Sequence, residues 1–139
     1  MIDTHTAYLA YGSNMGEKEE NILTAYRMTE GRVGRIVRRS AMVRSEPWGF
    51  KSDNGFVNSV ACVETTLTPR QLLSATQSIE RAMGRTEKSL GGVYHDRIID
   101  IDILLYDDIT LNDADLVIPH PLMHERDFVM KPLNEIRHT

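Results

Sequence analysis

The chain contains a single cysteine, Cys62, so it cannot form an internal disulfide. Cys62 lies in an alternating apolar run, which favours a packing role in a reducing compartment over a role as a nucleophile. No apolar run approaches the roughly 20 residues that a membrane-spanning helix requires. Residues 1–6 contain neither a basic segment nor a long apolar segment, so we expect no secretion signal. We therefore expect a cytoplasmic protein with no membrane partner.

The chain also lacks an excess of positive charge. Its 16 Lys and Arg residues are outnumbered by 20 Asp and Glu residues, which gives a formal net charge of −4. This charge provides no overall attraction to nucleic acid, so any phosphate-binding site must be local. With 139 residues and 41% hydrophobic content, the chain is expected to form one domain over residues 1–139. We expect a monomer.

Hydrophobic periodicity predicts four strands and two helices in the order β-α-β-β-α-β. The strands are predicted over residues 7–11, 36–45, 56–65 and 97–106, and the helices over residues 18–30 and from Thr68 to Gly84. This order is typical of a ferredoxin-like α+β fold, an antiparallel sheet with both helices on one face, here with C-terminal additions. We expect the other face to be open for a ligand. The fold of residues 128–136 stays undecided.

Local signals mark how the two helices begin. Thr68 as N-cap, Pro69 in the first turn and Gln71 three residues after Thr68 predict a capping box. For the earlier helix we expect Ser13 or Asn14 to be the cap, because the surrounding Gly-Ser-Asn-Met-Gly run lacks the spacing of a phosphate-binding loop. On the second helix we expect an inward apolar face, with the polar side chains directed elsewhere. The inward set is Leu72, Thr76, Ile79 and Met83, and the outward set is Gln77, Glu80 and Arg81.

Two carboxylates stand out on the last predicted strand. Asp100 and Asp102 share one face of it, while Ile99, Ile101, Ile103 and Leu105 are expected on the other face. Two like charges at neighbouring positions repel, so a cation would stabilise the pair. Arg97, His120, His124 and Arg126 are nearby basic residues that would suit a metal-bound polyphosphate. The alternative is an amphipathic strand with a solvated acidic face.

A flat ligand is suggested by the aromatic residues before and on the third strand. Trp48, in the loop over residues 45–50, either covers a ligand or anchors the loop to the core. Phe56 and Asn58 share one strand face and offer an aromatic plane beside an amide that can both donate and accept hydrogen bonds. An ordinary sheet face is the alternative. Arg85, Lys88 and Tyr94 lie in a Gly-containing loop that either closes over phosphates or is a solvated connection.

Taken together, these motifs resemble the 6-hydroxymethyl-7,8-dihydropterin pyrophosphokinase family. The most specific is Arg97-x-x-Asp100-Ile-Asp102-Ile-Leu. Others occur in the family's order along nearly the whole chain: Gly12-Ser13-Asn14, Arg44-Ser45-x-Pro47-x-Gly49, Gln77-x-Ile79-Glu80-x-x-x-Gly84-Arg85, Pro119-His120, Arg126-x-Phe128 and Pro132-Leu133-x-Glu135-Ile136. The resemblance implies transfer of pyrophosphate from ATP to the pterin alcohol, with release of AMP.

The resemblance also implies roles for individual residues. Asp100 and Asp102 would ligate two Mg²⁺ ions and, with Arg85 and Arg97, form the catalytic set. The pterin would contact Ser45, Pro47, Trp48, Phe56, Asn58, Asp100 and Phe128. The implied ATP-binding set is Gln77, Glu80, Arg85, Lys88, Tyr94, Arg97, Ile103, Ile118, His120 and Arg126. No side chain is an evident general base.

Two other functions fit the same order of elements. An RNA-binding module of the ferredoxin-like type would stack bases on exposed aromatic side chains, but the strand from Phe56 to Cys62 lacks the aromatic-rich signature. A different ATP-dependent kinase would release ADP instead of AMP. The nucleotide product therefore distinguishes the three functions.

Overall fold

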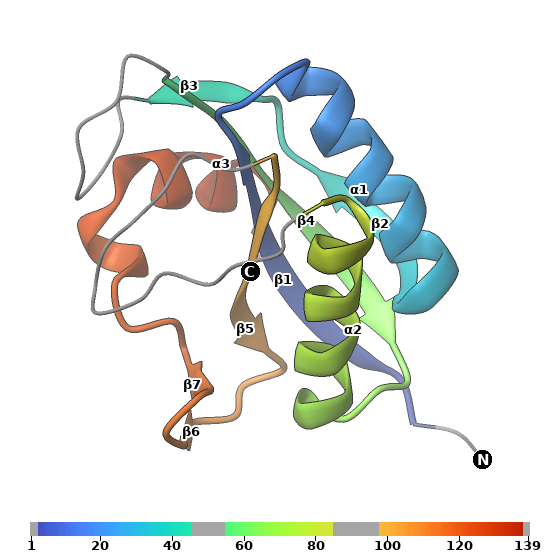
Figure 1. Cartoon of the computed structure of the whole chain (residues 1–139). Coiled ribbons are helices and arrows are strands. Elements are labelled where there is room, and N and C mark those ends of the chain that lie inside the picture. The colour runs from blue at the N-terminus through green and yellow to red at the C-terminus, as the bar shows by residue number, and fades with distance from the viewer. Residues whose placement is uncertain (1–2, 46–54, 85–97, 138–139) are drawn as a thin grey trace.

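The computed structural model describes residues 3–45, 55–84 and 98–137. Its elements in chain order (Figure 1) are β1 (His5–Ser13), α1 (Lys18–Arg32), β2 (Gly34–Arg39), β3 (Val43–Ser45), β4 (Phe56–Thr65), α2 (Pro69–Ala82), β5 (Asp100–Tyr106), β6 (Leu111–Asn112), β7 (Val117–Ile118), a 3-10 helix (Met123–Glu125) and α3 (Asp127–Ile136). Across the described parts of the chain, no helix is both long and apolar enough to cross a membrane.

Five strands form one antiparallel sheet. Their order is β2-β4-β1-β5, with β3 also paired to β4, while β6 and β7 form a separate hairpin. β1 is central because it pairs with β4 on one side and with β5 on the other. The prediction of a ferredoxin-like α+β fold with an antiparallel sheet is confirmed.

The strand predicted over residues 36–45 forms as two shorter strands, β2 and β3. The register of β2 against β4 shifts between Ile36 and Arg38, as at a β-bulge. Ser40, in the gap, stays bound to β4. Its backbone N–H donates to the Val60 carbonyl over 2.9 Å, and its hydroxyl accepts from the Val60 N–H over 2.9 Å.

α1 and α2 lie on one face of the sheet and α3 lies on the other (Figure 1), and each face carries its own hydrophobic cluster. Leu9 and Ala61 belong to the cluster of α1 and α2, whereas Ala10 and Val60 belong to the cluster of α3. The face that we expected to be open is therefore partly covered by α3. The segment that the sequence left undecided forms this helix although Pro132 stands inside it, where a proline removes a backbone donor. Packing of Val129, Leu133 and Ile136 against the sheet stabilises the helix there.

The alternation predicted for β5 holds at its start and fails at its end. Ile99, Ile101 and Ile103 lie in the cluster of α1 and α2, as predicted. Leu105 lies in the cluster of α3 instead. The register against β1 shifts there, because Tyr8 pairs with Leu105 while Leu9 pairs with Ile103. One extra residue in a strand moves the following side chains to the opposite face.

The prediction that Ser13 or Asn14 caps the first helix is wrong. The N-cap of α1 is Glu17, which makes no side-chain cap hydrogen bond. β1 runs through Ser13, and both Ser13 and Asn14 are fully buried. Asn21 of α1 stabilises the connection by donating from Nδ2 to the Met15 carbonyl over 2.8 Å and to Ser13 Oγ over 3.2 Å.

The capping box predicted for α2 is confirmed. Thr68 Oγ1 accepts from the Gln71 N–H over 3.2 Å, and Gln71 Oε1 accepts from the Thr68 N–H over 2.9 Å. The helix ends at Ala82, two residues before Gly84, whose φ of 104° suits a residue without a side chain.

Replacing Thr68 by Ala should lower the free energy of unfolding by about 1 kcal/mol, because the Gln71 N–H loses its acceptor. Urea unfolding followed by circular dichroism measures this change. Thr66, an exposed threonine two residues earlier, provides the control: Thr66→Ala should change stability by less than about 0.5 kcal/mol. Equal losses in the two variants would contradict a specific role of the capping hydroxyl.

Candidate active site

The two carboxylates on β5 face the side of the sheet on which α3 lies. Asp100 and Asp102 alternate with Ile101, which is buried on the side of α1 and α2. Both aspartates are partly exposed. Across the sheet, Asp100 pairs with Gly12 of β1, and Gly12 pairs with Asn58 of β4. The aspartate pair and Asn58 therefore lie on one surface, separated by a single strand.

The structure adds Gly12 to the residues that form this surface, a role that the sequence analysis missed. A Cβ at Gly12 would lie 3.2 Å from Asn58 Oδ1, which is tight, and 3.5 Å from Phe56 Cδ1, which is ordinary van der Waals contact. The missing side chain leaves space between Asn58 and Asp100. A glycine inside a strand often marks the close approach of a ligand or a backbone, and this was the available signal.

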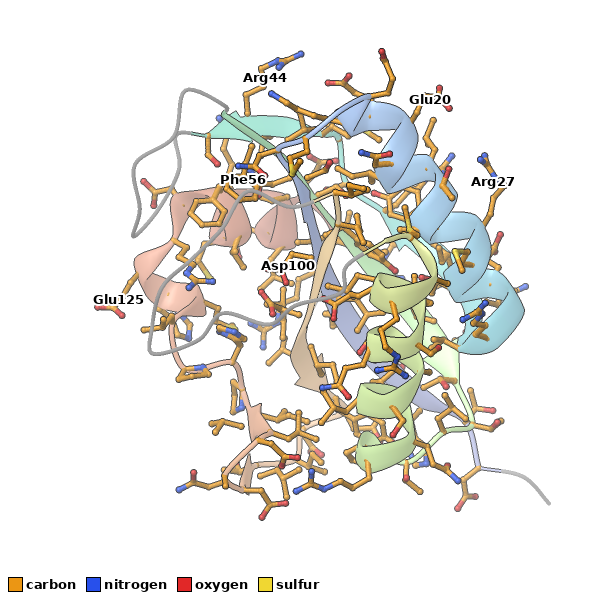
Figure 2. All side chains as sticks on the ribbon, in the orientation of Figure 1. Glu20, Arg27, Arg44, Phe56, Asp100 and Glu125 are labelled. Atoms are coloured by element: carbon orange, nitrogen blue, oxygen red, sulfur yellow. The ribbon has the colours of Figure 1, made fainter. Side chains whose placement is uncertain are left out.

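Phe56 and Asn58 form a wall beside Gly12. Figure 2 shows the side chains of Phe56 and Asp100 on the side of the sheet that carries α3. Asn58 is buried, and its Nδ2 donates to Ser45 Oγ over 2.8 Å. This bond holds the amide in place and directs Oδ1 toward Gly12. Phe128, at the start of α3, is partly buried against the cluster on the same face.

The prediction that Glu80 is directed away from the core is wrong. Glu80 is a buried residue on α2, and its Oε2 accepts a hydrogen bond from the Ile101 backbone N–H over 2.8 Å. β5 is the last strand of the described sheet, so no strand pairs with its outer edge. Ile101 lies between Asp100 and Asp102. The Glu80 carboxylate therefore fixes the backbone between the two aspartates.

His120 connects the aspartates to the C-terminal segment. Its backbone N–H donates to the Leu104 carbonyl of β5 over 3.0 Å. Burial lowers the pKa of the imidazole below its ordinary value, the nearby Arg126 guanidinium lowers it further, and Asp100 acts in the opposite direction. The Arg126 guanidinium also lies over the Phe128 ring, 5.8 Å from its centroid. Asp100, His120 and Arg126 thus form one electrostatic group.

The tautomer of neutral His120 follows from one hydrogen bond. The Leu122 N–H donates to His120 Nδ1 over 3.2 Å, so Nδ1 is the acceptor and Nε2 carries the proton. Neutral His120 can therefore donate from Nε2 to an oxygen atom of a ligand.

A cavity of about 280 Å³ lies between α2, β5 and the β6-β7 hairpin. Leu73 of α2, Leu116 beside β7 and Ile103 of β5 supply apolar walls, while Asp102 and His120 supply polar groups. Of the other predicted nucleotide-site residues, Gln77 is half-buried on α2 and Ile118 is fully buried in the core.

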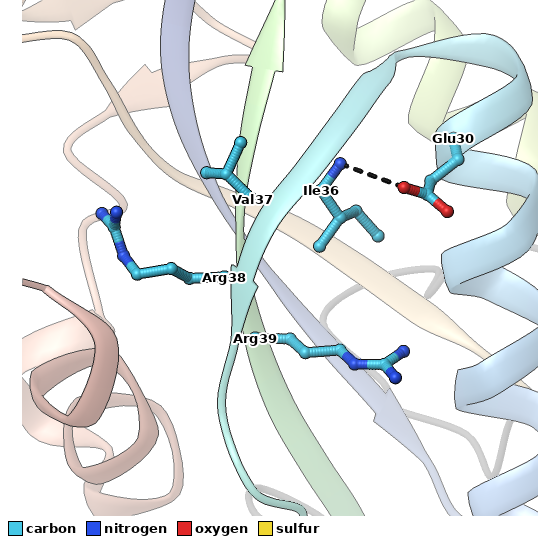
Figure 3. A pocket seen from close by; sticks show the side chains of 5 residues that line it. All are labelled: Glu30, Ile36, Val37, Arg38 and Arg39. Atoms are coloured by element: carbon cyan, nitrogen blue, oxygen red, sulfur yellow. Dashed lines mark hydrogen bonds between the residues drawn. The ribbon is translucent and has the colours of Figure 1, made fainter.

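Another hollow, of about 380 Å³, lies at the edge strand β2 (Figure 3). Its arginines are engaged in structural contacts. Arg38 Nε donates to the Ile136 carbonyl over 2.9 Å, and the Arg39 guanidinium lies 5.2 Å from the centroid of the Tyr26 ring. None of the residues predicted for the site lines this hollow.

Part of the predicted site lies outside the described residues. This part consists of Pro47, Trp48, Arg85, Lys88, Tyr94 and Arg97. Within residues 3–45, 55–84 and 98–137, no three histidine, cysteine, aspartate or glutamate side chains are grouped as a metal site.

Known proteins share both the sequence and the fold of this chain. A family model described as 7,8-dihydro-6-hydroxymethylpterin-pyrophosphokinase matches residues 8–138. A 2-amino-4-hydroxy-6-hydroxymethyldihydropteridine pyrophosphokinase of Porphyromonas gingivalis is 46% identical over 130 residues, which cover 93% of this chain and 88% of the relative. A Bacillus subtilis protein with the same description is 36% identical over 131 residues, with 94% and 77% covered.

Solved structures agree at the level of the fold. A crystal structure of an HPPK-DHPS in complex with substrates has a TM-score of 0.76 at 16% identity and covers 95% of this chain. This chain spans 40% of that longer protein. A Plasmodium falciparum HPPK-DHPS with pterin and p-hydrobenzoate has a TM-score of 0.70 at 17% identity, with 96% of this chain and 41% of the other covered.

His120 should titrate below pH 6.5 in the absence of divalent cations, with Nδ1 unprotonated in the neutral form. A ¹⁵N NMR titration measures both properties, and His120→Asn identifies the signals. Because the folded state binds this proton less tightly than the unfolded state, stability should fall as the pH drops below 6.5. A midpoint at or above 6.5, or a neutral form protonated on Nδ1, would contradict this assignment.

Proposed function

The chain belongs to the 7,8-dihydro-6-hydroxymethylpterin-pyrophosphokinase family, and we propose that Asp100 and Asp102 bind the Mg²⁺ and the phosphates of ATP in its reaction. Its function is pyrophosphokinase activity in folate biosynthesis. The observation that carries the site proposal is the row of neighbours on adjacent strands, Asn58, Gly12 and Asp100. In this row, only β1 separates the strand that carries Phe56 and Asn58, which can contact a flat ring, from the strand that carries the two aspartates.

The donor set suits magnesium. Mg²⁺ in polyphosphate sites usually takes one or two carboxylates and completes its octahedron with water and substrate phosphates. Asp100 and Asp102 are two partly exposed carboxylates on one face of β5, which matches this pattern. When bound, the metal neutralises the phosphate charge that develops during transfer. The Glu80 carboxylate holds the backbone N–H of Ile101, which lies between the two aspartates.

The pterin is proposed to bind against Phe56 and Asn58. The Phe56 ring supplies an apolar plane, and Asn58, held by Ser45, supplies an amide at the ring edge. Gly12 leaves the space that the ring needs. Phe128 lies on the same face of the sheet and would cover the opposite side of the ring, with Pro47 and Trp48 contributing from the preceding loop.

The nucleotide is proposed to occupy the cavity between α2, β5 and the β6-β7 hairpin. Leu73, Ile103 and Leu116 would contact the base, and Asp102 lies where the phosphates would begin. His120, through its Nε2–H, and Arg126 would contact phosphate oxygens. The same role is proposed for Arg85, Lys88 and Arg97, with Gln77 and Tyr94 beside the nucleoside.

In the proposed reaction, the hydroxymethyl oxygen of the pterin attacks the β-phosphorus of ATP. A new bond forms between that oxygen and the β-phosphorus, and the bond from the β-phosphorus to the oxygen bridging the α-phosphorus breaks. AMP leaves with the bridging oxygen, and the hydroxyl proton is released. Catalysis rests on positioning and on charge neutralisation, as is usual in phosphoryl transfer.

The RNA-binding alternative conflicts with the position of α3. In modules of that class, bases stack on the exposed face of the sheet. Here α3 packs against that face through Val129, Leu133 and Ile136.

Replacing Asp102 by Asn should reduce AMP formation by at least about 100-fold, because a negatively charged ligand becomes neutral. The assay contains ATP, Mg²⁺ and 6-hydroxymethyl-7,8-dihydropterin, and chromatography identifies the nucleotide released. Asp108→Asn, which changes an exposed aspartate just after β5, is the matched control and should retain full activity. Near-normal AMP formation by the Asp102 variant would refute the proposed site.

Replacing Gly12 by Ala should raise the KM for the pterin by about tenfold, because the new Cβ approaches Asn58 Oδ1 to 3.2 Å and fills space that the ring would occupy. The KM for ATP should change much less. Steady-state kinetics with each substrate varied in turn measures both values. Gly31→Ala is the control, since no atom lies within 4 Å of a Cβ added there. An unchanged pterin KM in the Gly12 variant would place the pterin elsewhere.

A further inference from the structure

Arg70 joins α2 to the β6-β7 hairpin through a forked ion pair. Its Nη1 lies 2.5 Å from Asp115 Oδ1, and its Nη2 lies 2.6 Å from Asp113 Oδ2. Arg70 is in the first turn of α2, while the two aspartates lie in the turn that connects β6 to β7. Figure 1 shows this hairpin beside the N-terminal end of α2. We name the three residues the Arg70 clasp.

The position of Arg70 in its helix is electrostatically unfavourable without these partners. The N-terminal end of a helix carries partial positive charge, so acidic residues are stabilising there and basic residues are not. α2 has no acidic residue in its first turn. The two aspartates of the hairpin therefore supply the negative charge that this end of the helix lacks.

The hairpin is anchored to the core through Leu116 and Ile118, whereas its turn over residues 113–115 is exposed. β6 and β7 are two residues long each, and their turn is closed by the Asp113 N–H donating to the Leu116 carbonyl over 3.0 Å. Two-stranded hairpins of this length are not stable alone. A forked contact to a rigid helix fixes both the distance and the orientation of the turn relative to α2.

The clasp borders the cavity that we assign to the nucleotide. Asp115 and Leu116 line it from the hairpin, and Leu73 lines it from α2, one turn after Arg70. The clasp thus connects two walls of the cavity at their common edge. Leu73 and Leu116 also pack in the same hydrophobic cluster, so the clasp acts on the exposed rim of these two walls.

We propose that Arg70 is a positioning residue that holds the hairpin wall at the spacing the nucleoside of ATP requires. This inference rests on the proposed function, in which that cavity takes the nucleotide. Arg70 acts through Asp113 and Asp115 and touches no substrate. Loosening the clasp should therefore weaken ATP binding and leave pterin binding and the chemical step unchanged.

A purely electrostatic role makes the opposite prediction for one variant. Asp115 is an acidic group at the edge of a site for an anion, so its neutralisation would tighten ATP binding if charge alone mattered. If the clasp positions the wall, Asp115→Asn weakens ATP binding as Arg70→Ala does. The two changes then act on one contact and are not additive.

The experiment measures the KM for ATP, the KM for the pterin and kcat. Calorimetry in the presence of Mg²⁺ adds a fourth value, the Kd of an α,β-methylene analogue of ATP. We expect Arg70→Ala and Asp115→Asn each to raise the KM and Kd for the nucleotide by about three- to fivefold, the size typical of an exposed ion-pair network. The double variant should bind the nucleotide no more weakly than Arg70→Ala does. Arg70→Lys preserves the charge and loses the forked geometry. Its KM and Kd for the nucleotide should lie between those of the unchanged protein and those of Arg70→Ala.

Arg27→Ala is the matched control, because Arg27 is an exposed arginine on α1 whose guanidinium donates to Thr24 of the same helix, away from the β6-β7 hairpin. It should leave all four values unchanged. Tighter ATP binding by Asp115→Asn, or a parallel change in pterin KM and kcat in Arg70→Ala and Arg70→Lys, would overturn the proposal. If Asp102→Asn leaves the nucleotide Kd unchanged, the nucleotide site itself is misplaced, and the role proposed for Arg70 is refuted as well.

Discussion

The site depends on the pairing of β1 with two neighbours at once. β1 pairs antiparallel with β4 and with β5, and this double pairing aligns Asn58, Gly12 and Asp100 in one row. Because side chains alternate along each strand, all three face the side of α3. A slip of one residue in either pairing would turn Asp100 or Asn58 toward the cluster of α1 and α2. The hydrophobic cluster on that side, which includes Leu9, Tyr11 and Ile101, opposes such a slip.

Polar contacts on both sides of the sheet stabilise this arrangement. At the outer edge of β5, the buried carboxylate of Glu80 accepts a hydrogen bond from the Ile101 N–H. The edge strand thus has a partner where the described sheet has no further strand. On the other face, Arg38 donates to the Ile136 carbonyl over 2.9 Å, and Glu135 accepts from the Ala41 N–H over 2.9 Å. A cation at the C-terminal end of α3 also complements the helix dipole. These contacts hold α3 against the sheet.

The charged residues of the proposed site come from distant parts of the sequence. Asp100 and His120 are twenty positions apart, yet His120 N–H binds the Leu104 carbonyl of the strand that carries Asp100. Arg126 and Phe128 follow at the start of α3. A turn, a short hairpin and a 3-10 helix therefore bring basic groups back to the acidic pair, and the Arg70 clasp fixes the hairpin on that path.

The sequence by itself determined the types and order of the main elements, the capping box of α2 and the placement of both aspartates on one strand. These features depend on periodicity and on hydrogen bonds within a few residues, which are visible in a short window. The tertiary structure decided the role of Gly12, the burial of Glu80, the side on which Leu105 packs and the position of α3. These outcomes depend on strand register, on a bulge and on contacts between residues more than twenty positions apart. No local pattern specifies them, because the free energy that selects them comes from packing between elements.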